Sequence, residues 1–484
     1  MNEPSLPIEK IASIRKEKLE KLKSLGINPY PTKYDIDSSI ADVHNENEDI
    51  KIGEMGPEKI SVAGRLVSRR EMGKASFADI LDLSGKIQLY FKANVVGDES
   101  FKIFKDLVDL SDFIGVKGVP FRTKAGELTI NVEEWTFLSK SLKPLPEKWH
   151  GLKDTETRYR QRYLDLISNK EVKEIFLKRS KIISSMRNDL ENLGFIEVET
   201  PMMQKIAGGA AASPFVTHHK ALDIDLYMRI APELYLKRLV TGGMEKVFEI
   251  GRNFRNEGID RGHNPEFTML ELYQGYVDYN EMMRLCEELV VSAAKKIGAE
   301  FKTPFNKKKL FDLLKENTGL DVQSLLGSGK MKDLIKKFSL DIPSSTPEHK
   351  ILDHLFDAKV LPKLKDPTFI IDYPSVFSPL AKAKADDPQI AERFELYMGG
   401  MEIANAFSEL NDPQEQKKRF VAQVEAKKKG DEEAQSYDED FITALEHGMP
   451  PTGGLGIGID RLVMVLGNIN SIREVILFPT LRPE

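Results

Sequence analysis

The sequence predicts an α+β protein with a small N-terminal β-barrel and a larger part that combines strands with amphipathic helices. Three observations support this fold class. Residues 60–138 contain five short β-like runs separated by turn signals, residues 245–277 contain two strands around a long polar loop, and residues 170–193 have helical periodicity. A chain of 484 residues is also too long for one typical core, so two or three domains are expected.

The composition is that of an ordinary globular protein. Hydrophobic residues make up 41% and charged residues 30% of the chain, and no apolar run is long enough to span a bilayer. The opening residues lack the layout of a secretory signal, and the single Cys286 excludes an internal disulfide framework or a Cys-rich zinc site. We therefore expect a cytoplasmic protein with no membrane partner. Because the net charge is −6, nucleic-acid binding would need a local basic surface.

Residues 60–138 predict a closed barrel. Its strands are expected at residues 60–69, 76–82, 86–92, 113–122 and 128–138. Such barrels bind single-stranded nucleic acid by stacking bases on aromatic rings and following the backbone with cations. Phe77, Arg69 and Gln88 are candidates for stacking, phosphate contact and base-edge hydrogen bonding, although a phenylalanine in a short strand is more often a core residue. The Lys-rich helix expected at residues 10–25 either presents a solvated face or lies near a phosphate backbone.

The connection between the two parts is expected at residues 141–157, which contain Pro144 and Pro146. An amphipathic helix at residues 170–193 then leads into a strand that ends at Pro201. This helix and strand form either core packing or a subunit interface, and periodicity alone does not separate the two. Residues 300–365 are Lys-rich and helical in pattern, and we interpret them as an insertion.

The strand pair in residues 245–277 has an unusual face. Side chains alternate along a strand, so Phe267, Glu271 and Tyr273 share one side of the second arm. An aromatic ring, a carboxylate and a phenol on one face are unsuited to a dry core. They predict a pocket that holds a ring and a cation.

Two later stretches add similar side chains. Asn405, Phe407 and Glu409 share one strand face, whereas Glu402 has the opposite parity and needs a bulge to reach the same site. Residues 453–458 place glycines at alternate positions, which either leave room for a flat ligand or mark a packing crossover. Arg461 would follow from the first turn of the next helix.

These stretches together resemble the three ordered motifs of the class II aminoacyl-tRNA synthetases. The strings APELYLKRL, RNFRNEG, HNPEFT, ELNDP and GIGIDRLVM resemble the lysyl-tRNA synthetase family in particular. The resemblance implies an antiparallel catalytic sheet flanked by helices, preceded by an anticodon-binding barrel of the OB type. It also implies three regions: an N-terminal helix and barrel at 1–140, a linker at 141–157, and a catalytic domain at 158–484 with the insertion at about 300–365.

The same resemblance implies an ATP site. Adenine would lie between Phe267 and Arg461, Glu257 would read its amino group, and His263 would reach the outer phosphates. Arg255 would bridge the α-phosphate and the lysine carboxylate, so Arg255 and Arg461 are the expected catalytic residues. Magnesium would be held by Glu395 and Glu402, because it takes oxygen ligands that it shares with phosphates.

An amino-acid pocket for lysine is implied beside the ATP site. Two carboxylates that point into one pocket repel each other unless a cation lies between them. The residues expected around lysine are Glu271, Tyr273 and Glu409 at the side-chain ammonium, Glu233 and Gly209 at the α-amine, Arg255 and Asn405 at the carboxylate, and Phe407 along the stem.

The reaction implied is lysine activation by ATP, followed by transfer of the lysyl group to the 3′ end of tRNA(Lys). Catalysis would come from positioning and charge stabilisation, without a covalent nucleophile. Phe77 and Gln88 match the family's anticodon-reading positions, and Arg69 and Glu127 match less closely. A homodimer through residues 170–201 is expected.

Two alternatives stay open at this point. A paralogue that lysylates a protein would lack the barrel predicted at residues 60–138, and a non-catalytic RNA-binding relative would have lost active-site residues that are intact here. Four positions depart from the usual family pattern, namely Ser213, Lys220, Gly262 and Ala404. These departures affect the expected contact with the ATP tail and the local loop geometry.

Overall fold

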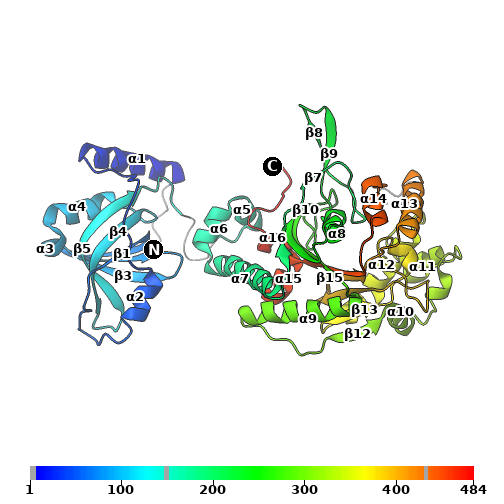
Figure 1. Cartoon of the computed structure of the whole chain (residues 1–484). Coiled ribbons are helices and arrows are strands. Elements are labelled where there is room, and N and C mark those ends of the chain that lie inside the picture. Colours follow the sequence, from blue (N-terminus) through cyan, green and yellow to red (C-terminus); the bar gives the residue numbers. More distant parts are fainter. Residues whose placement is uncertain (1–6, 146–151, 430–433, 484) are drawn as a thin grey trace. The chain divides into compact units, whose positions relative to one another are not determined.

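The computed structural model describes residues 7–145, 152–429 and 434–483, which divide into two compact units, residues 1–151 and 152–484 (Figure 1). The division lies inside the segment 141–157 that the sequence marks as a linker. Residues 146–151 of that segment, and residues 1–6 of the expected first domain, lie outside the described residues. Each unit has a hydrophobic core of its own.

The first unit confirms the predicted five-stranded barrel. Its sheet closes in the order β1-β2-β3-β5-β4. The strands are β1 (Ile60–Met72), β2 (Ala75–Leu81), β3 (Lys86–Lys92), β4 (Phe113–Arg122) and β5 (Leu128–Ser139). The helices of this unit are α1 (Ile8–Ser24), α2 (Ile40–Glu46), α3 (Ala93–Val96) and α4 (Asp98–Leu107). Alternate side chains of the strands fill the barrel, as the period of two predicts.

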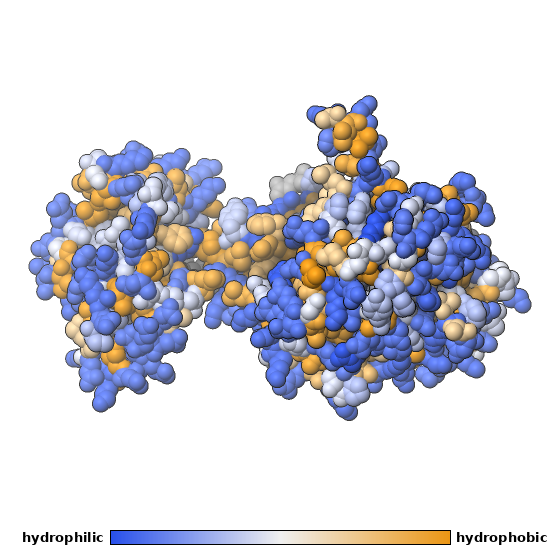
Figure 2. Space-filling model, viewed as in Figure 1, coloured by the Kyte–Doolittle hydropathy of each residue, from blue (hydrophilic) through white to orange (hydrophobic). Residues whose placement is uncertain are grey.

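The second unit is built on the expected antiparallel sheet. Eight strands pair in the order β12-β13-β14-β15-β16-β11-β10-β6, and only the two outermost pairs are parallel. In that order the strands are Asn306–Lys309, Thr368–Ile371, Arg393–Met398, Met401–Ser408, Thr452–Gly458, Glu266–Gly275, Lys246–Phe254 and Ile196–Glu197. A separate three-stranded sheet contains β7 (Met203–Gln204), β9 (Ile224–Met228) and β8 (Val216–His219). The β8–β9 hairpin projects from the unit and has apolar side chains at its tip (Figure 2).

Helices cover one face of the eight-stranded sheet. The core there joins strand residues such as Leu270 and Leu272 to the apolar sides of α7, α9 and α15. The helices of this unit are α5 (Thr155–Arg160), α6 (Arg162–Ser168), α7 (Lys170–Asn192), α8 (Glu233–Thr241), α9 (Tyr279–Lys296), α10 (Leu310–Thr318), α11 (Met331–Phe338), α12 (Glu348–Lys359), α13 (Pro413–Lys428), α14 (Glu439–Glu446), α15 (Ile459–Gly467) and α16 (Ile472–Val475). None of the helices in the described ranges has the length and apolarity that crossing a bilayer requires.

The segment at residues 300–365 corrects the expectation of a wholly helical insertion. Helices α10, α11 and α12 do form a small core of their own, but Asn306–Lys309 is the edge strand β12. The sequence NKKK has no hydrophobic alternation that would reveal a strand. It is held by parallel pairing with β13, which lies far along the chain.

The helix–strand segment after the linker is confirmed in part. Helix α7 occupies the predicted residues, and Gly194 follows it with a φ of +81°, a conformation that favours glycine. The strand after it is short, because only Ile196 and Glu197 pair with β10.

Candidate active site

A cavity of about 900 Å³ opens on the face of the sheet opposite α7 and α9. Its lining includes thirteen of the fourteen residues that the sequence assigns to the catalytic site: Gly209, Glu233, Arg255, Glu257, His263, Phe267, Glu271, Tyr273, Glu402, Asn405, Phe407, Glu409 and Arg461. Glu395 lies outside this lining. The structure therefore brings together side chains that the chain separates by more than 200 residues.

Strand β11 shows how the local fold positions these side chains. Leu270 and Leu272 are buried in the core below the sheet, while Phe267, Glu271 and Tyr273 line the cavity above it. The alternation of a β-strand therefore gives one face to packing and the other to the site.

Three carboxylates lie at one end of the cavity, and all three are buried: Glu233 on α8, Glu271 on β11, and Glu409 after β15. Burial, with the neighbouring Glu233 as the next cause, raises the pKa of Glu271 to about 8. Burial also raises the pKa of Glu409 well above its ordinary value. The oxygen Oε1 of Glu409 has no hydrogen-bond partner among the described residues. The buried carboxylates make this end of the cavity suited to binding cations.

Glycine makes room for these acids at two positions. A Cβ atom built on Gly454 of β16 would lie 1.9 Å from Glu409 Oε1 and 2.6 Å from the Tyr273 ring. A Cβ atom on Gly209, where φ is +88°, would lie 2.9 Å from Glu233 Cβ. The sequence suggested that the glycine strand leaves space for a ligand, but Gly454 directly accommodates the pocket's own side chains.

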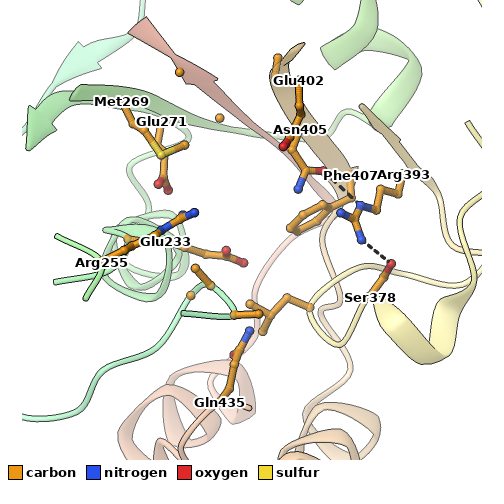
Figure 3. A pocket seen from close by; sticks show the side chains of 18 of the residues that line it. Glu233, Arg255, Met269, Glu271, Ser378, Arg393, Glu402, Asn405, Phe407 and Gln435 are labelled. Carbon is orange, nitrogen blue, oxygen red and sulfur yellow. Dashed lines mark hydrogen bonds between the residues drawn. The ribbon is translucent and has the colours of Figure 1, made fainter. Parts of the chain in front are cut away.

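Arg255 lies just beyond the end of β10 and supplies the opposite charge. Figure 3 shows its side chain and that of Glu271 entering the same space. Its guanidinium carbon lies 5.0 Å from the centre of the Phe267 ring, and its buried Nε has no hydrogen-bond partner among the described residues. A guanidinium that lines a cavity and has an unused donor is suited to binding a phosphate or a carboxylate.

The loop between β10 and β11 is organised by Asp260. Its carboxylate accepts hydrogen bonds from the backbone N–H groups of Gly262 and His263, at 2.6 and 2.9 Å. It also lies 2.8 Å from His263 Nδ1, while Arg461 Nη2 lies 2.9 Å from His263 Nε2. Because arginine only donates, this network assigns the proton of a neutral His263 to Nδ1. Glu257, on the same loop, is exposed.

The bulge that the parity of Glu402 requires is present in β15. Residue Leu396 pairs with Ala404, but Tyr397 pairs with Glu402, so Ile403 is the extra residue. Glu402 thereby lines the cavity and lies 3.4 Å from Arg461 Nη1. Burial, followed by the charge of Glu395, raises the pKa of Glu402.

Glu395 is buried and already has three partners. Its Oε2 accepts hydrogen bonds from the hydroxyls of Tyr373 and Tyr397, and its Oε1 accepts one from Arg393. A carboxylate has about four acceptor positions, so one position on Oε1 is left. Among the described residues no cluster of three or more metal-ligating side chains occurs. Two carboxylates nevertheless fit a magnesium ion that takes its remaining oxygens from phosphates and water.

Asn405 and Phe407 come from the same strand face, as predicted. Asn405 accepts a hydrogen bond from Arg393 Nε, and Arg393 Nη1 donates to Ser378 at 3.0 Å (Figure 3). Arg393 was not anticipated from the sequence, although its position two residues before Glu395 on one strand was a usable signal.

Lys237 was also missed. It is fully buried on α8, with its Nζ atom 2.6 Å from Glu233 Oε1 and in contact with Glu409 Oε2. The spacing of four residues from Glu233 on a helix could have revealed it.

The barrel has a second candidate surface. The rings of Phe77 and Tyr90 stack with centroids 4.5 Å apart, and Tyr90, two residues after Gln88 on β3, was missed by the sequence reasoning. Gln88 Nε2 donates to Glu127 at 3.3 Å. Arg69 is differently placed: its Nη1 donates to the backbone carbonyls of Phe104 and Val108 at the end of α4.

Comparison with known proteins agrees with this geometry. Residues 154–482 match the family described as tRNA synthetases class II (D, K and N), and residues 60–138 match the OB-fold nucleic acid binding domain. A lysine–tRNA ligase from Syntrophomonas wolfei is 50% identical over 100% of this chain and 99% of its own length. Lysine–tRNA ligases from Pelotomaculum thermopropionicum and Aquifex aeolicus are 52% and 54% identical, covering 99% and 88% of this chain and 96% and 73% of their own lengths.

The chain belongs to the lysine–tRNA ligase family. Its class II sheet, its OB-type barrel and the full-length similarity all agree with this assignment. Ligases of this family use ATP together with a divalent metal.

Proposed function

We propose that this protein activates L-lysine with ATP to form lysyl-adenylate and pyrophosphate, and then transfers the lysyl group to the 3′ end of tRNA(Lys). The observation that carries the proposal is the buried group of Glu233, Glu271 and Glu409 at one end of the cavity. Three carboxylates in so dry a site need cations, and lysine brings two ammonium groups.

ATP would occupy the part of the cavity lined by the β10–β11 loop. Adenine would stack on Phe267 with Arg461 on its other side, and exposed Glu257 would accept a hydrogen bond from the adenine amino group. The Nε of Arg255, which has no hydrogen-bond partner among the described residues, supports a contact of this guanidinium with the α-phosphate and the lysine carboxylate, where charge develops during attack. His263 would meet the outer phosphates.

Lysine would fill the acidic end. Glu271, Tyr273 and Glu409 would hold the side-chain ammonium, and Glu233 with the backbone at Gly209 would hold the α-ammonium. Phe407 would pack on the aliphatic stem, and Asn405, held by Arg393, would contact the carboxylate. The lysine carboxylate itself is the nucleophile, so these residues act by orienting it.

Magnesium would be held by Glu402 and by the remaining acceptor position of Glu395. A bound magnesium ion supplies positive charge that neutralises the phosphate oxygens. The bulge at Ile403 turns Glu402 toward the cavity, where burial and then the charge of Glu395 raise the pKa of Glu402. Restoration of activity to metal-depleted protein by Mg²⁺, but not by Ca²⁺, would test the choice of ion.

The barrel would read the anticodon. The Phe77–Tyr90 stack offers a platform for a base, and Gln88 with Glu127 offers donors and acceptors beside it. Nη1 of Arg69 is engaged with α4 and its Nη2 lies 3.6 Å from Glu71 Oε1, so Arg69 would meet a phosphate only if Nη2 exchanges Glu71 for it.

A homodimer would form through α7 and β6, with the assembled enzyme in the cytoplasm. Leu177, Leu193 and Ile196 on this segment are large apolar residues exposed to solvent in the isolated chain. Sedimentation of the full chain, beside a Leu177→Glu variant, would show whether this face joins two copies.

The decisive experiment is amino-acid-dependent exchange of pyrophosphate into ATP with Mg²⁺ across a panel of amino acids. Exchange should depend on lysine, and Glu271→Gln or Glu409→Gln should abolish that dependence. Exchange stimulated by aspartate or asparagine and not by lysine would overturn the substrate assignment. A protein that binds tRNA but forms no adenylate would instead be a non-catalytic relative, and lysylation of a protein in place of tRNA would favour the paralogue.

A further inference from the structure

Lys237 places a cation directly behind the carboxylates that line the amino-acid pocket. Its side chain is fully buried, and its Nζ lies 2.6 Å from Glu233 Oε1 and in contact with Glu409 Oε2. The centres of the Tyr273, Phe407 and Phe441 rings lie 5.9, 5.5 and 6.0 Å away. Water therefore has no access to this ammonium, and its partners are pocket carboxylates and aromatic faces.

The position is unusual because the two carboxylates have different tasks in the proposed function. Glu233 is assigned to the α-ammonium of the substrate and Glu409 to the side-chain ammonium. Lys237 occupies one oxygen of each, and in the described part of the chain Oε1 of Glu409 has no hydrogen-bond partner. Figure 3 shows Glu233 directed into the space below Phe407, where the substrate stem would lie.

The charges of the pocket can be counted. Glu233, Glu271 and Glu409 contribute three negative charges when ionised, and Lys237 contributes one positive charge. Two negative charges are left, which equals the number of ammonium groups on lysine. The substrate carboxylate is left to Arg255, whose Nε has no partner among the described residues.

We propose that Lys237 is a positioning residue that sets substrate specificity, by pairing with Glu233 and Glu409 and aiming them so that a diamino acid completes the charge balance. The inference rests on the proposed function and extends it to a residue that does not touch the substrate. An amino acid with one ammonium group would leave one buried carboxylate unpaired, which is strongly unfavourable in a dry site.

All charged groups that face Glu233 and Glu409 bear on this balance. From α8 there is Lys237, from β11 there are Glu271 and Tyr273, and Arg393 of β14 acts on Glu233. From α14, the ring of Phe441 faces Lys237. Burial raises the pKa of Glu233 and Glu409, and Lys237 is the first neighbour that lowers it in both cases. Loss of Lys237 would therefore raise the proton affinity of the two acids further, and a protonated acid does not pair with the ammonium groups of lysine.

The test compares the wild type with Lys237→Met in lysine-dependent pyrophosphate exchange between pH 6.5 and 9. The KM of the variant for lysine should be at least about tenfold higher at pH 7. In the pH profile of kcat/KM for lysine, the acidic limb should move to higher pH by about one unit. The KM for ATP should stay unchanged. Lys237→Arg, which keeps the charge, should return the acidic limb to its wild-type position.

Arg238→Met is the matched control. Arg238 is the next residue on α8 and binds Asp438 and Asp440 away from the cavity. Its loss should lower the melting temperature without moving the acidic limb. If Lys237→Met yields no folded protein, Lys237→Gln keeps a donor of similar reach and should show the same shift.

Two results would overturn the inference while leaving the proposed function intact. One is a Lys237→Met variant that loses stability but keeps the wild-type pH profile and KM for lysine. The other is a Lys237→Arg variant whose acidic limb moves as far as that of the methionine variant. A wild-type protein without lysine-dependent exchange would instead overturn the proposed function.

Discussion

The tightest constraint at the residue scale is the space that Gly454 leaves. The three atoms nearest to a Cβ at this position belong to Glu409 and Tyr273, which are both buried. Neither group can move away cheaply, because a displaced buried carboxylate loses its ion pair with Lys237. The glycine is therefore required by the pocket and not by the strand.

We expect Gly454→Ala to raise the KM for lysine at least about tenfold, because the new methyl group displaces Glu409. The KM for ATP should change little. Gly458→Ala is the control, since the nearest atoms to its Cβ would be 3.7 and 4.0 Å away. Equal effects of the two substitutions in pyrophosphate exchange would contradict this explanation.

The pKa of Glu271 predicts how lysine binding depends on pH. Because burial raises this pKa to about 8, the carboxyl is mainly protonated in the free protein at neutral pH. An ammonium group needs the ionised form, so the Kd for lysine should rise about tenfold for each pH unit below 8 and level off above it. Calorimetric titration from pH 6.5 to 9 measures this.

The stability of the free protein changes with pH in the opposite direction to lysine binding. A carboxyl with a raised folded-state pKa stabilises the free protein at low pH, and this contribution is lost between its ordinary value of 4.5 and about 8. Lysine should therefore raise the melting temperature more at pH 8 than at pH 6.5. Glu271→Gln should remove most of the pH dependence of the Kd for lysine and of the rise in melting temperature that lysine causes. A wild-type Kd that does not change between pH 6.5 and 9 would exclude Glu271 as the titrating group.

At the scale of elements, Asp460 joins three of them. This residue lies in the first turn of α15, pairs with Arg179 of α7 at 2.6 Å and accepts a hydrogen bond from the backbone N–H of Thr268 on β11 at 2.6 Å. The pair is nearly buried, with 13% and 3% of the two side chains exposed. It ties strand β11, the helix of Arg461 and the predicted interface helix α7 together.

We expect Arg179→Met to lower the free energy of unfolding by about 3 kcal/mol, because it leaves the Asp460 charge buried without its cation. Arg187→Met on the same helix removes a pair with Glu197 that is about one-third exposed on each side, and should cost less than about 1 kcal/mol. Denaturant unfolding of both variants makes the comparison. A similar loss of unfolding free energy in the two variants would mean that burial does not make the Arg179–Asp460 pair more important for stability than the exposed pair.

At the scale of the whole molecule, the two units carry separate cores and separate candidate sites. The stack of Phe77 on Tyr90 lies in the barrel, whereas the cavity lies wholly within residues 152–484. A change in the barrel surface should therefore affect tRNA recognition without affecting adenylate formation.

We expect Phe77→Ala to lower kcat/KM for tRNA(Lys) in aminoacylation. The loss should correspond to about 1–3 kcal/mol, the range for loss of one base–aromatic stack. Lysine-dependent pyrophosphate exchange by the same variant serves as its internal control and should match the wild type. Loss of exchange together with charging would point to misfolding, and unchanged charging would remove Phe77 from the anticodon site.

The sequence by itself determined the barrel strands, the hairpin with its two faces, helix α7 and the bulge at Glu402, because each rests on local periodicity. It also supplied thirteen of the cavity's lining residues through contiguous motifs. What it did not reveal is strand β12, whose NKKK sequence pairs only because β13 lies beside it. Strand pairing of this kind depends on partners far along the chain.

Only the tertiary structure decided which charges meet. Lys237 and Glu409 are separated by more than 170 residues, yet they share one buried ion pair, and Arg69 turns to the end of α4 because that helix packs beside β1. Burial then changes the proton affinity of Glu271 and Glu409, which no local pattern encodes. The residue types follow from the sequence, but their electrostatics follow from how the fold excludes water.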